Sequence, residues 1–259
     1  MKILLTNDDG IFAEGINLLA LALKRRGYEI MISAPMENQS CVGHGLTLRS
    51  MLYAERRILC GLEDVPCYAV SGTPVDCVRL SLDNFGFEPE LIVSGINHAS
   101  NLGTDTLYSG TVSAALEASM LGFPAIAVSK DTFTTEFMED AAEYFADLLP
   151  ELISVMKHEP GIGMLSVNIP SMPRTSLAGL RVAPIATQRY ELRYTETEND
   201  NGRVGYTVKS IKLTECSADE ISDERFVRDG YVVVTPLLYD LTDLAHMQSV
   251  KILERDAEK

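Results

Sequence analysis

Residues 2–11 read KILLTNDDGI, in which a short apolar run at residues 2–6 is followed by two adjacent aspartates. The run predicts a buried strand, because apolar residues are followed at once by turn-forming ones. A helix is expected next, with apolar residues three and seven positions after Ile16 and a glycine stop at Gly27. Residues 28–34 are again apolar and predict a second strand. A strand, a helix and a strand in so short a stretch indicate a βαβ unit with parallel strands.

The same alternation continues along the chain. Further strands are predicted at residues 91–94, 125–129 and 164–169, and helices at residues 109–121 and 136–158. Strands that alternate with helices favour an α/β fold, doubly wound around a largely parallel sheet. The first strand of such a sheet is usually central. Its carboxyl end is therefore expected near the point where the strand order reverses and ligands bind.

The character of the sequence changes after about Pro184. Residues 189–196 and 203–209 predict a protruding β-hairpin, and residues 199–202 (Asn-Asp-Asn-Gly) predict its turn, because Asn-Gly accepts positive φ. So polar a hairpin has little core of its own, and we expect it to lie exposed or to pack on a partner subunit. We divide the chain into an α/β domain at residues 1–185 and a smaller region at residues 186–259, with the hairpin, a returning strand and a C-terminal tail.

Charge excludes two classes of partner. The formal net charge is −15, from 22 Lys and Arg against 37 Asp and Glu. Such a surface repels nucleic-acid polymers and anionic membranes at long range, so we expect neither as a partner.

No stretch approaches the ~20 apolar residues that span a bilayer. The five cysteines are odd in number, and the N-terminus lacks a signal-peptide pattern, which together predict reduced thiols and a cytoplasmic location.

The adjacent carboxylates of Asp8 and Asp9 are the main chemical signal in the sequence. At the end of a central strand they would repel each other, and a divalent cation is the simplest way to keep both ionised. Oxygen ligands of this kind suit Mg, Mn or Ca. The alternative for this motif alone is a polar turn in which one aspartate caps the next helix.

Two further loops follow predicted strands. Residues 34–45 contain Ser40, a neutral oxygen ligand, and His44, which suits a proton donor, a phosphate contact or a purely structural role. Residues 94–103 contribute Asn97 and Asn101. The segment Ser109-Gly110-Thr111 opens a predicted helix, whose N-terminus is a natural anion site. The chain has no Walker loop and no dinucleotide fingerprint before a helix, which argues against ATP-driven phosphoryl transfer and NAD chemistry. The acid, hydroxyl and amide groups of the three loops after the predicted strands together predict a metal-assisted phosphate site.

These blocks also carry a resemblance that extends over nearly the whole chain. The blocks are TNDDGI (6–11), SAP with the later S and GH (33–44), GTPVDCV (72–78), SGIN (94–97), NLG (101–103), YSGT (108–111), and TPL with DLTD (235–243). In this order and spacing the chain resembles the SurE family (survival protein E), which are divalent-metal-dependent nucleoside-monophosphate phosphatases. The resemblance implies a Rossmann-like fold and a homodimer or homotetramer, with the hairpin and tail exchanged or packed between subunits.

The resemblance also implies roles for single residues. One divalent metal ion per subunit, Mg, Mn or similar, would be held by Asp8, Asp9, Ser40 and Asn97. Asn101, Ser109, Gly110 and Thr111 would face the phosphate. The turn at residues 72–76 is expected to be scaffold. Cys41 and Ala99 stand where the family commonly has glycine, and Gly45 where it has a small hydroxyl residue; these departures leave the four ligand positions intact.

The expected reaction is hydrolysis of nucleoside 5′- and 3′-monophosphates, and of short-chain polyphosphate, by a metal-activated water. Asp8 or Asp9 would accept a proton from that water, and His44 or a second water would protonate the leaving group. A phosphoaspartate mechanism is an alternative, although adjacent aspartates suit it less well than Asp-x-Asp. A nucleotide- or metal-binding sensor without turnover is a third hypothesis, because a binding pocket uses the same groups.

Overall fold

The structure is a computed structural model that describes residues 1–132, 134–159, 161–187, 190–198, 201–212 and 221–255. The strands are β1 (Lys2–Thr6), β2 (Glu29–Pro35), β3 (Ala54–Arg57), β4 (Cys67–Val70), β5 (Leu91–Asn97), β6 (Ala125–Lys130), β7 (Met164–Ile169), β8 (Gly179–Val182), β9 (Tyr190–Glu198), β10 (Val204–Lys212) and β11 (Tyr231–Leu237). The α-helices are α1 (Glu14–Arg25), α2 (Pro74–Asn84), α3 (Gly110–Met120), α4 (Met138–His158), α5 (Asp223–Arg228) and α6 (Met247–Val250). Short 3₁₀ helices are η1 (Gly103–Leu107), η2 (Arg174–Ser176) and η3 (Lys251–Leu253).

The main sheet confirms the predicted α/β class. Its strand order is β3-β4-β2-β1-β5-β6-β7-β11-β8, and its neighbours are parallel except for the pairs β3/β4 and β7/β11. Strand β1 lies between β2 and β5, so the chain leaves β1 in one direction and later returns on its other side. This reversal of strand order places the carboxyl end of β1 where ligands bind in open α/β sheets.

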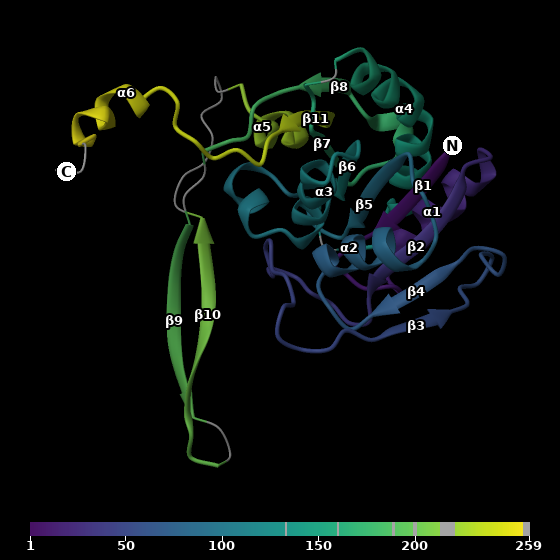
Figure 1. Ribbon diagram of the computed structural model, residues 1–259, viewed down its shortest axis with the longest axis horizontal. Helices are drawn as coiled ribbons and strands as arrows, with labels where there is room; N and C mark the ends of the chain where they lie inside the picture. Colours follow the sequence, from purple (N-terminus) through teal and green to yellow (C-terminus); the bar gives the residue numbers. More distant parts are fainter. Residues whose placement is uncertain (133, 160, 188–189, 199–200, 213–220, 256–259) are drawn as a thin grey trace.

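Helices cover both faces of the sheet (Figure 1). On one face, α1 and α4 pack against the strands through residues such as Leu19, Phe145 and Ile3, all fully buried. On the other face, α2 and α3 pack through Val78, Ala115 and Leu4. Alternate residues of β1 therefore point to opposite helix layers, as the period of a strand requires. Burial of both faces explains why the central strands are continuous apolar runs.

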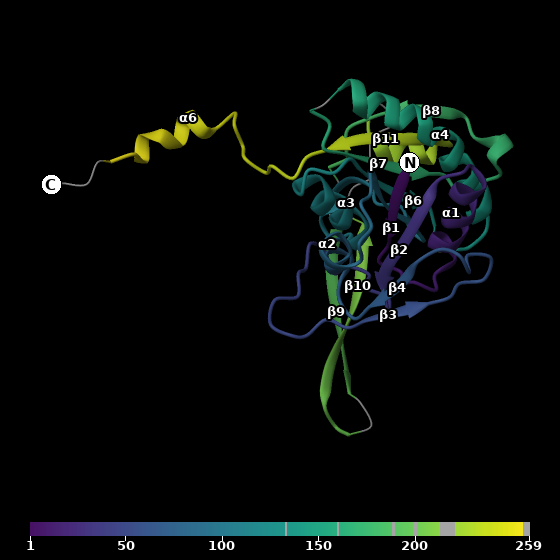
Figure 2. The same cartoon turned by 45° about the vertical axis from the view of Figure 1, so that its right-hand side comes forward.

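The hairpin β9–β10 stands away from the sheet and its helices, and the tail that carries α6 extends separately (Figure 1). The turned view in Figure 2 shows both projections again. The hairpin strands β9 and β10 pair in an antiparallel register, with Tyr194 opposite Val208 and Tyr206 opposite Glu196. The predicted hairpin and tail are therefore present. Of the turn predicted at 199–202, the first two residues lie outside the described ranges, as do Arg189 and Cys216.

Several elements were not predicted from the sequence: β3, β4, α2, β8 and α5. The turn expected at residues 72–76 is the start of α2. Thr73 caps this helix by accepting a hydrogen bond from the Asp76 backbone, and the Asp76 carboxylate accepts one from the Thr73 backbone at 2.9 Å. Asp76 also accepts hydrogen bonds from the backbone and hydroxyl of Thr47 at 3.0 and 2.7 Å. These bonds tie the loop after β2 to α2.

Within the described ranges, no helix has the length and apolar character needed to cross a membrane.

Candidate functional site

Asp8 lies at the carboxyl end of β1 and is 3% exposed. The Thr111 hydroxyl donates a hydrogen bond to Asp8 Oδ1 at 2.5 Å, which links β1 to the first turn of α3. The pKa of Asp8 is raised to about 6, because burial and the negative charge of Asp9 together outweigh the lowering effect of the hydrogen bonds from Thr111. A cation close to such a buried carboxyl group would stabilise its ionised form.

Asp9 shares this environment but turns to different partners. Its Oδ2 accepts a hydrogen bond from the His98 backbone at 3.2 Å, and His98 Nδ1 lies 3.9 Å from the same oxygen. Burial raises the pKa of Asp9, and the nearby imidazole of His98 lowers it. The loop after β5 is thereby held against the loop after β1. His98 was not among the residues predicted for the site, although its position directly after Asn97 was a usable signal.

The loop after β2 is attached to the same strand end. The Gln39 backbone donates to the Asp8 carbonyl at 2.7 Å, and Asn38 Nδ2 lies 3.4 Å from Asp9 Oδ1. Asn38 Oδ1 in turn accepts a hydrogen bond from the Ser40 backbone at 2.8 Å. These bonds bring the exposed Ser40 to the edge of the sheet that carries both aspartates. The Ser40 hydroxyl is thus carried by the same loop that is bonded to both aspartates.

Asn97 ends β5, the strand next to β1. Its side-chain nitrogen donates to the Ala99 carbonyl at 2.7 Å. Since the nitrogen is committed there, the other side-chain atom, Oδ1, is left as an acceptor. Ala99, one of the departures from the family pattern, contributes only its backbone to this bond.

The donor set fits a hard divalent cation. It offers two carboxylates, from Asp8 and Asp9, and neutral oxygens from Ser40 and Asn97. Oxygen ligands of this mixture suit Mg and Mn, whereas sulfur and imidazole groups would favour softer metals. In the part of the chain that the structure describes, no three His, Cys, Asp or Glu side chains gather as a metal-binding group. A cation here would therefore rely on Ser40 and Asn97 to complete its shell.

The N-terminus of α3 faces Asp8. Ser109 is the N-cap residue, and its hydroxyl accepts a hydrogen bond from the Val112 backbone at 3.0 Å. Gly110 follows, and a Cβ added to it would lie 2.8 Å from Asp8 Cβ. Thr111 uses its hydroxyl on Asp8 rather than leaving it to a ligand. One of the residues predicted to face the phosphate, Thr111, thus holds the first aspartate in place.

Asn101 lies in an internal network. Its side-chain nitrogen donates to the Ser129 hydroxyl at 2.7 Å, and its backbone exchanges two hydrogen bonds with the Asn168 side chain at 2.9 and 3.2 Å. These bonds join the loop after β5 to β6 and β7. In this conformation Asn101 supports the loop, and contact with a phosphate stays a prediction.

His44 lies in a different cluster from the two aspartates. Its Nε2 is 2.6 Å from Glu117 Oε2 on α3, and Glu117 also forms an ion pair with Arg79 on α2. Glu117 is 3% exposed, while the His44 side chain is about one third exposed. No contact between His44 and either aspartate is found among the described residues. Its role as a proton donor therefore stays a prediction.

Comparisons with known proteins agree over nearly the whole chain. Residues 3–192 match the family model described as Survival protein SurE. The chain is 40% identical over 263 residues to the 5′-nucleotidase SurE of Synechococcus elongatus, covering 98% of this chain and 100% of the relative. It is 38% identical to the 5′-nucleotidase SurE of Alkaliphilus metalliredigens, with 98% of each covered.

A solved structure extends this agreement to the fold. The crystal structure of the SurE protein from Aquifex aeolicus matches with a TM-score of 0.79 and 36% identity, covering 98% of this chain and 100% of that one. The matched length includes the strand ends that carry Asp8, Asp9 and Asn97, whose geometry is described above. By its sequence, its strand order and these matches, the chain belongs to the SurE family.

Proposed function

We propose that this protein is a divalent-metal-dependent phosphomonoesterase that hydrolyses nucleoside 5′- and 3′-monophosphates, and short-chain polyphosphate, to release phosphate. The observation that carries the proposal is the pair of adjacent, mostly buried carboxylates at the switch point of the sheet, held against the N-terminus of α3. The names of the relatives, 5′-nucleotidase, support the choice of substrate.

The proposed metal ligands are Asp8, Asp9, Ser40 and Asn97. When bound, a divalent ion supplies positive charge for the phosphoryl oxygens and activates water for attack. Thr111 holds Asp8 in position through its 2.5 Å hydrogen bond, and His98 holds Asp9 through its backbone. Asp8 or Asp9 would accept the proton released by the attacking water. The amides at the start of α3 favour the negative charge of the phosphate.

His44 is proposed as the proton donor to the leaving group, with a second water as the alternative donor. The buried carboxylate of Glu117 lies 2.6 Å from His44 Nε2 and fixes the direction of the ring. The ion pair between Glu117 and Arg79 holds that carboxylate in place. His44 is therefore built into a cluster that orients its ring.

Phosphate release tests the proposed function against the alternatives. We expect the purified protein to release inorganic phosphate from AMP or GMP with Mg or Mn, and to lose this activity in excess chelator. A substrate panel at fixed metal ranks 5′ against 3′ phosphates and polyphosphate. Tight nucleotide binding with no release at any metal would instead favour a sensor. A phosphorylated enzyme trapped on Asp8 or Asp9 would favour the phosphoaspartate mechanism.

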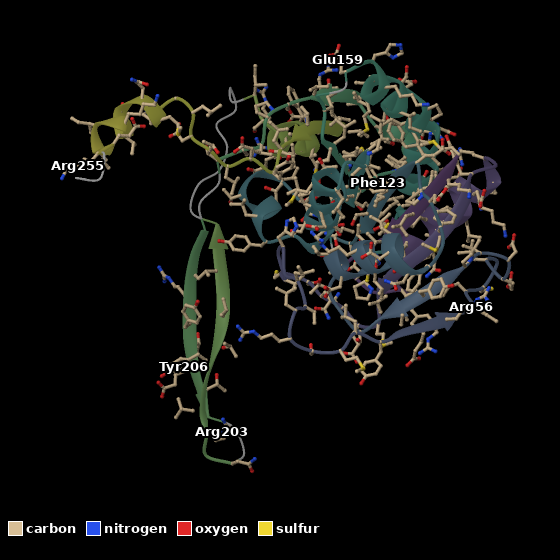
Figure 3. All side chains as sticks on the ribbon, in the orientation of Figure 1. Arg56, Phe123, Glu159, Arg203, Tyr206 and Arg255 are labelled. Carbon is tan, nitrogen blue, oxygen red and sulfur yellow. The ribbon has the colours of Figure 1, made fainter. Side chains whose placement is uncertain are left out.

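We further propose that the region at residues 186–259 assembles the protein into a homodimer or homotetramer. In the antiparallel register, Leu192, Tyr194, Tyr206 and Val208 fall on one face of the hairpin, and all are exposed. The other face carries polar residues such as Thr195 and Thr207. Figure 3 shows Tyr206 and Arg203 on the hairpin, far from the sheet. An exposed apolar face on an isolated two-stranded hairpin favours contact with a second copy of the chain.

The two faces of the hairpin provide a matched test of assembly. The double variant Tyr194→Ser with Val208→Ser is expected to lower the mass measured by light scattering to that of a smaller species, because it removes apolar contact area. The double variant Thr195→Ser with Thr207→Ser changes the opposite, polar face and is expected to keep the original mass. An unchanged mass for both variants would contradict the proposal.

The predicted cytoplasmic location is retained as a proposal. Cys41, Cys60, Cys67 and Cys77 are free thiols in the structure. Free thiols are what a reducing compartment maintains. Nucleic-acid polymers and membranes are not proposed as partners, because the net charge of −15 repels both.

A further inference from the structure

A recess lies along the same edge of the sheet as the two aspartates. It has a volume of about 440 Å³. Its lining comes from the loop after β5 (Ser100, Leu102), the loop after β6 (Asp131, Thr132), the loop after β7 (Ser171, Met172) and α5. Figure 1 shows β6, β7 and α5 in the same part of the molecule. None of these lining residues has a role in the reaction proposed above.

A buried lysine, Lys130, lies under the recess and is hydrogen-bonded to its lining. Lys130, the last residue of β6, is fully buried. Its ammonium donates to the Asp131 carbonyl at 3.1 Å, to the Ser171 hydroxyl at 3.0 Å and to the Thr132 hydroxyl at 3.4 Å. Three lining residues are thus fixed by one side chain beneath them. Burial lowers the pKa of Lys130 by disfavouring its charged form, and these three hydrogen bonds offset part of that cost.

Asp131 is held at three points. Its backbone N–H donates to the Ile169 carbonyl at 2.8 Å, and its own carbonyl accepts from Lys130. Its Oδ1 accepts from the Ser100 hydroxyl at 3.1 Å. Among the residues that the structure describes, no donor reaches Oδ2. The carboxylate is therefore fixed in direction and keeps acceptor capacity toward the recess.

The lining determines which part of a substrate can enter. Leu102, Met172 and Val227 provide an apolar wall, and hydroxyl and carboxylate groups provide acceptors. The lining also carries the carboxylates of Asp105, Asp131 and Glu224 and the guanidinium of Arg228, with the Lys130 ammonium beneath it. The remaining acceptor oxygen of Asp131 suits a neutral group with several hydroxyl or amino donors.

The distance between the aspartate pair (Asp8 and Asp9) and the recess fits the length of one nucleotide. Asp9 is bonded to the backbone of His98, and Ser100 of the recess follows two residues later in the same loop. Adjacent strands are about 4.8 Å apart, so the ends of β1 and β6, with β5 between them, are separated by roughly 10 Å. A phosphate beside Asp8 and Asp9 therefore leaves the rest of a nucleotide within reach of Asp131.

We propose that this recess is the nucleoside subsite of the enzyme, with Asp131 accepting hydrogen bonds from the ribose hydroxyls and Leu102, Met172 and Val227 contacting the base. The proposal rests on the proposed nucleotidase function and specifies its substrate. A 5′-monophosphate leaves the 2′,3′-diol free for the carboxylate, whereas a 3′-monophosphate blocks half of it. The subsite therefore favours 5′ substrates and ribose over deoxyribose.

Asp131→Ala tests the subsite when activity on AMP, 2′-deoxy-AMP and phenyl phosphate is compared. We expect the ratio of kcat/KM for AMP to that for phenyl phosphate to fall roughly 10- to 100-fold, the effect of losing a hydrogen bond to a charged group. The preference for AMP over its 2′-deoxy analogue is expected to shrink in the same variant. Met172→Trp, which fills the recess, should lower the same ratio through steric exclusion. Asp83→Ala, at an exposed aspartate on α2, is the control that leaves all three activities unchanged.

The outcomes separate this proposal from the proposed function. Equal losses on AMP and phenyl phosphate, or no loss on AMP, would overturn the nucleoside subsite while the phosphatase assignment stands. If the wild-type protein releases phosphate from none of these esters, the proposed function fails. Calorimetry with adenosine alone then decides the subsite: binding that Asp131→Ala abolishes supports it, and absence of binding to the wild type overturns it.

Discussion

Asp8→Asn is expected to lower the proposed metal-dependent phosphate release by about a thousandfold or more, because it removes the charge of a proposed metal ligand. The variant is also expected to be more stable than the wild type when metal is removed. In the metal-free protein, burial raises the pKa of Asp8 from 3.8 to about 6, so ionised Asp8 opposes folding. A pKa shift of one unit corresponds to about 1.4 kcal/mol. Above pH 6 the ionised carboxylate therefore lowers the free energy of unfolding by about 2 to 3 kcal/mol at most.

The sign of the pH dependence follows from the raised pKa. The stability contributed by protonated Asp8 is fully present below its unfolded pKa and is lost as pH rises through its folded value near 6. The advantage of Asp8→Asn, measured by urea unfolding in chelator, should therefore be largest at pH 7.5 and should shrink toward pH 4. Asparagine keeps an oxygen for the Thr111 hydroxyl, so the variant tests charge rather than packing. Near-normal turnover of Asp8→Asn would contradict the assignment of Asp8.

Gly110→Ala is the second change with a large expected effect. The added Cβ would lie 2.8 Å from Asp8 Cβ, 3.0 Å from Asp8 Oδ2 and 3.2 Å from the Pro74 ring. Asp8 must then move away from α3, and misplacement of a reacting group by an ångström costs on the order of 100-fold in rate. We therefore expect kcat/KM for AMP to fall about 100-fold, with weaker activation by metal at low concentration.

A matched glycine provides the control for this variant. Gly161→Ala adds the same methyl group where no atom lies within 4 Å. It is expected to leave activity and the unfolding midpoint close to those of the wild type. If Gly110→Ala keeps full activity, the close packing of α3 against Asp8 does not matter for the reaction. Circular dichroism of both variants separates a local change at the site from loss of the fold.

The strand and helix signals near the site were readable because they are local. The apolar run at residues 2–6 and the strand at 164–169 match β1 and β7 at both ends. The helix predicted at residues 109–121 is α3, with Ser109 as its cap. In contrast, β3 and β8 are four-residue strands with no fully buried residue. Such strands gain their conformation from pairing with neighbours, which periodicity cannot detect.

The contacts of the candidate site residues depended more on the tertiary structure. Nothing local to His44 indicates that it meets Glu117, 73 residues later, on α3. The hydrogen bond from Thr111 to Asp8 joins residues 103 positions apart and shows how a residue expected at the phosphate also orients a carboxylate. His98 was missed because its bond to Asp9 is made by its backbone, so only its position after Asn97, and not its residue type, could have indicated it.

The sequence alone determined the α/β class, the central first strand and the chemical character of the strand ends, because each depends on periodicity, composition and neighbouring residues. Only the tertiary structure decided which of those polar groups meet. It buried Asp8 beside α3, placed His44 with Glu117, and set Asp131 over the Lys130 ammonium at a separate recess. The physical reason is that burial, desolvation and hydrogen-bond partners arise from packing between distant segments, and these set the charge and direction of each side chain.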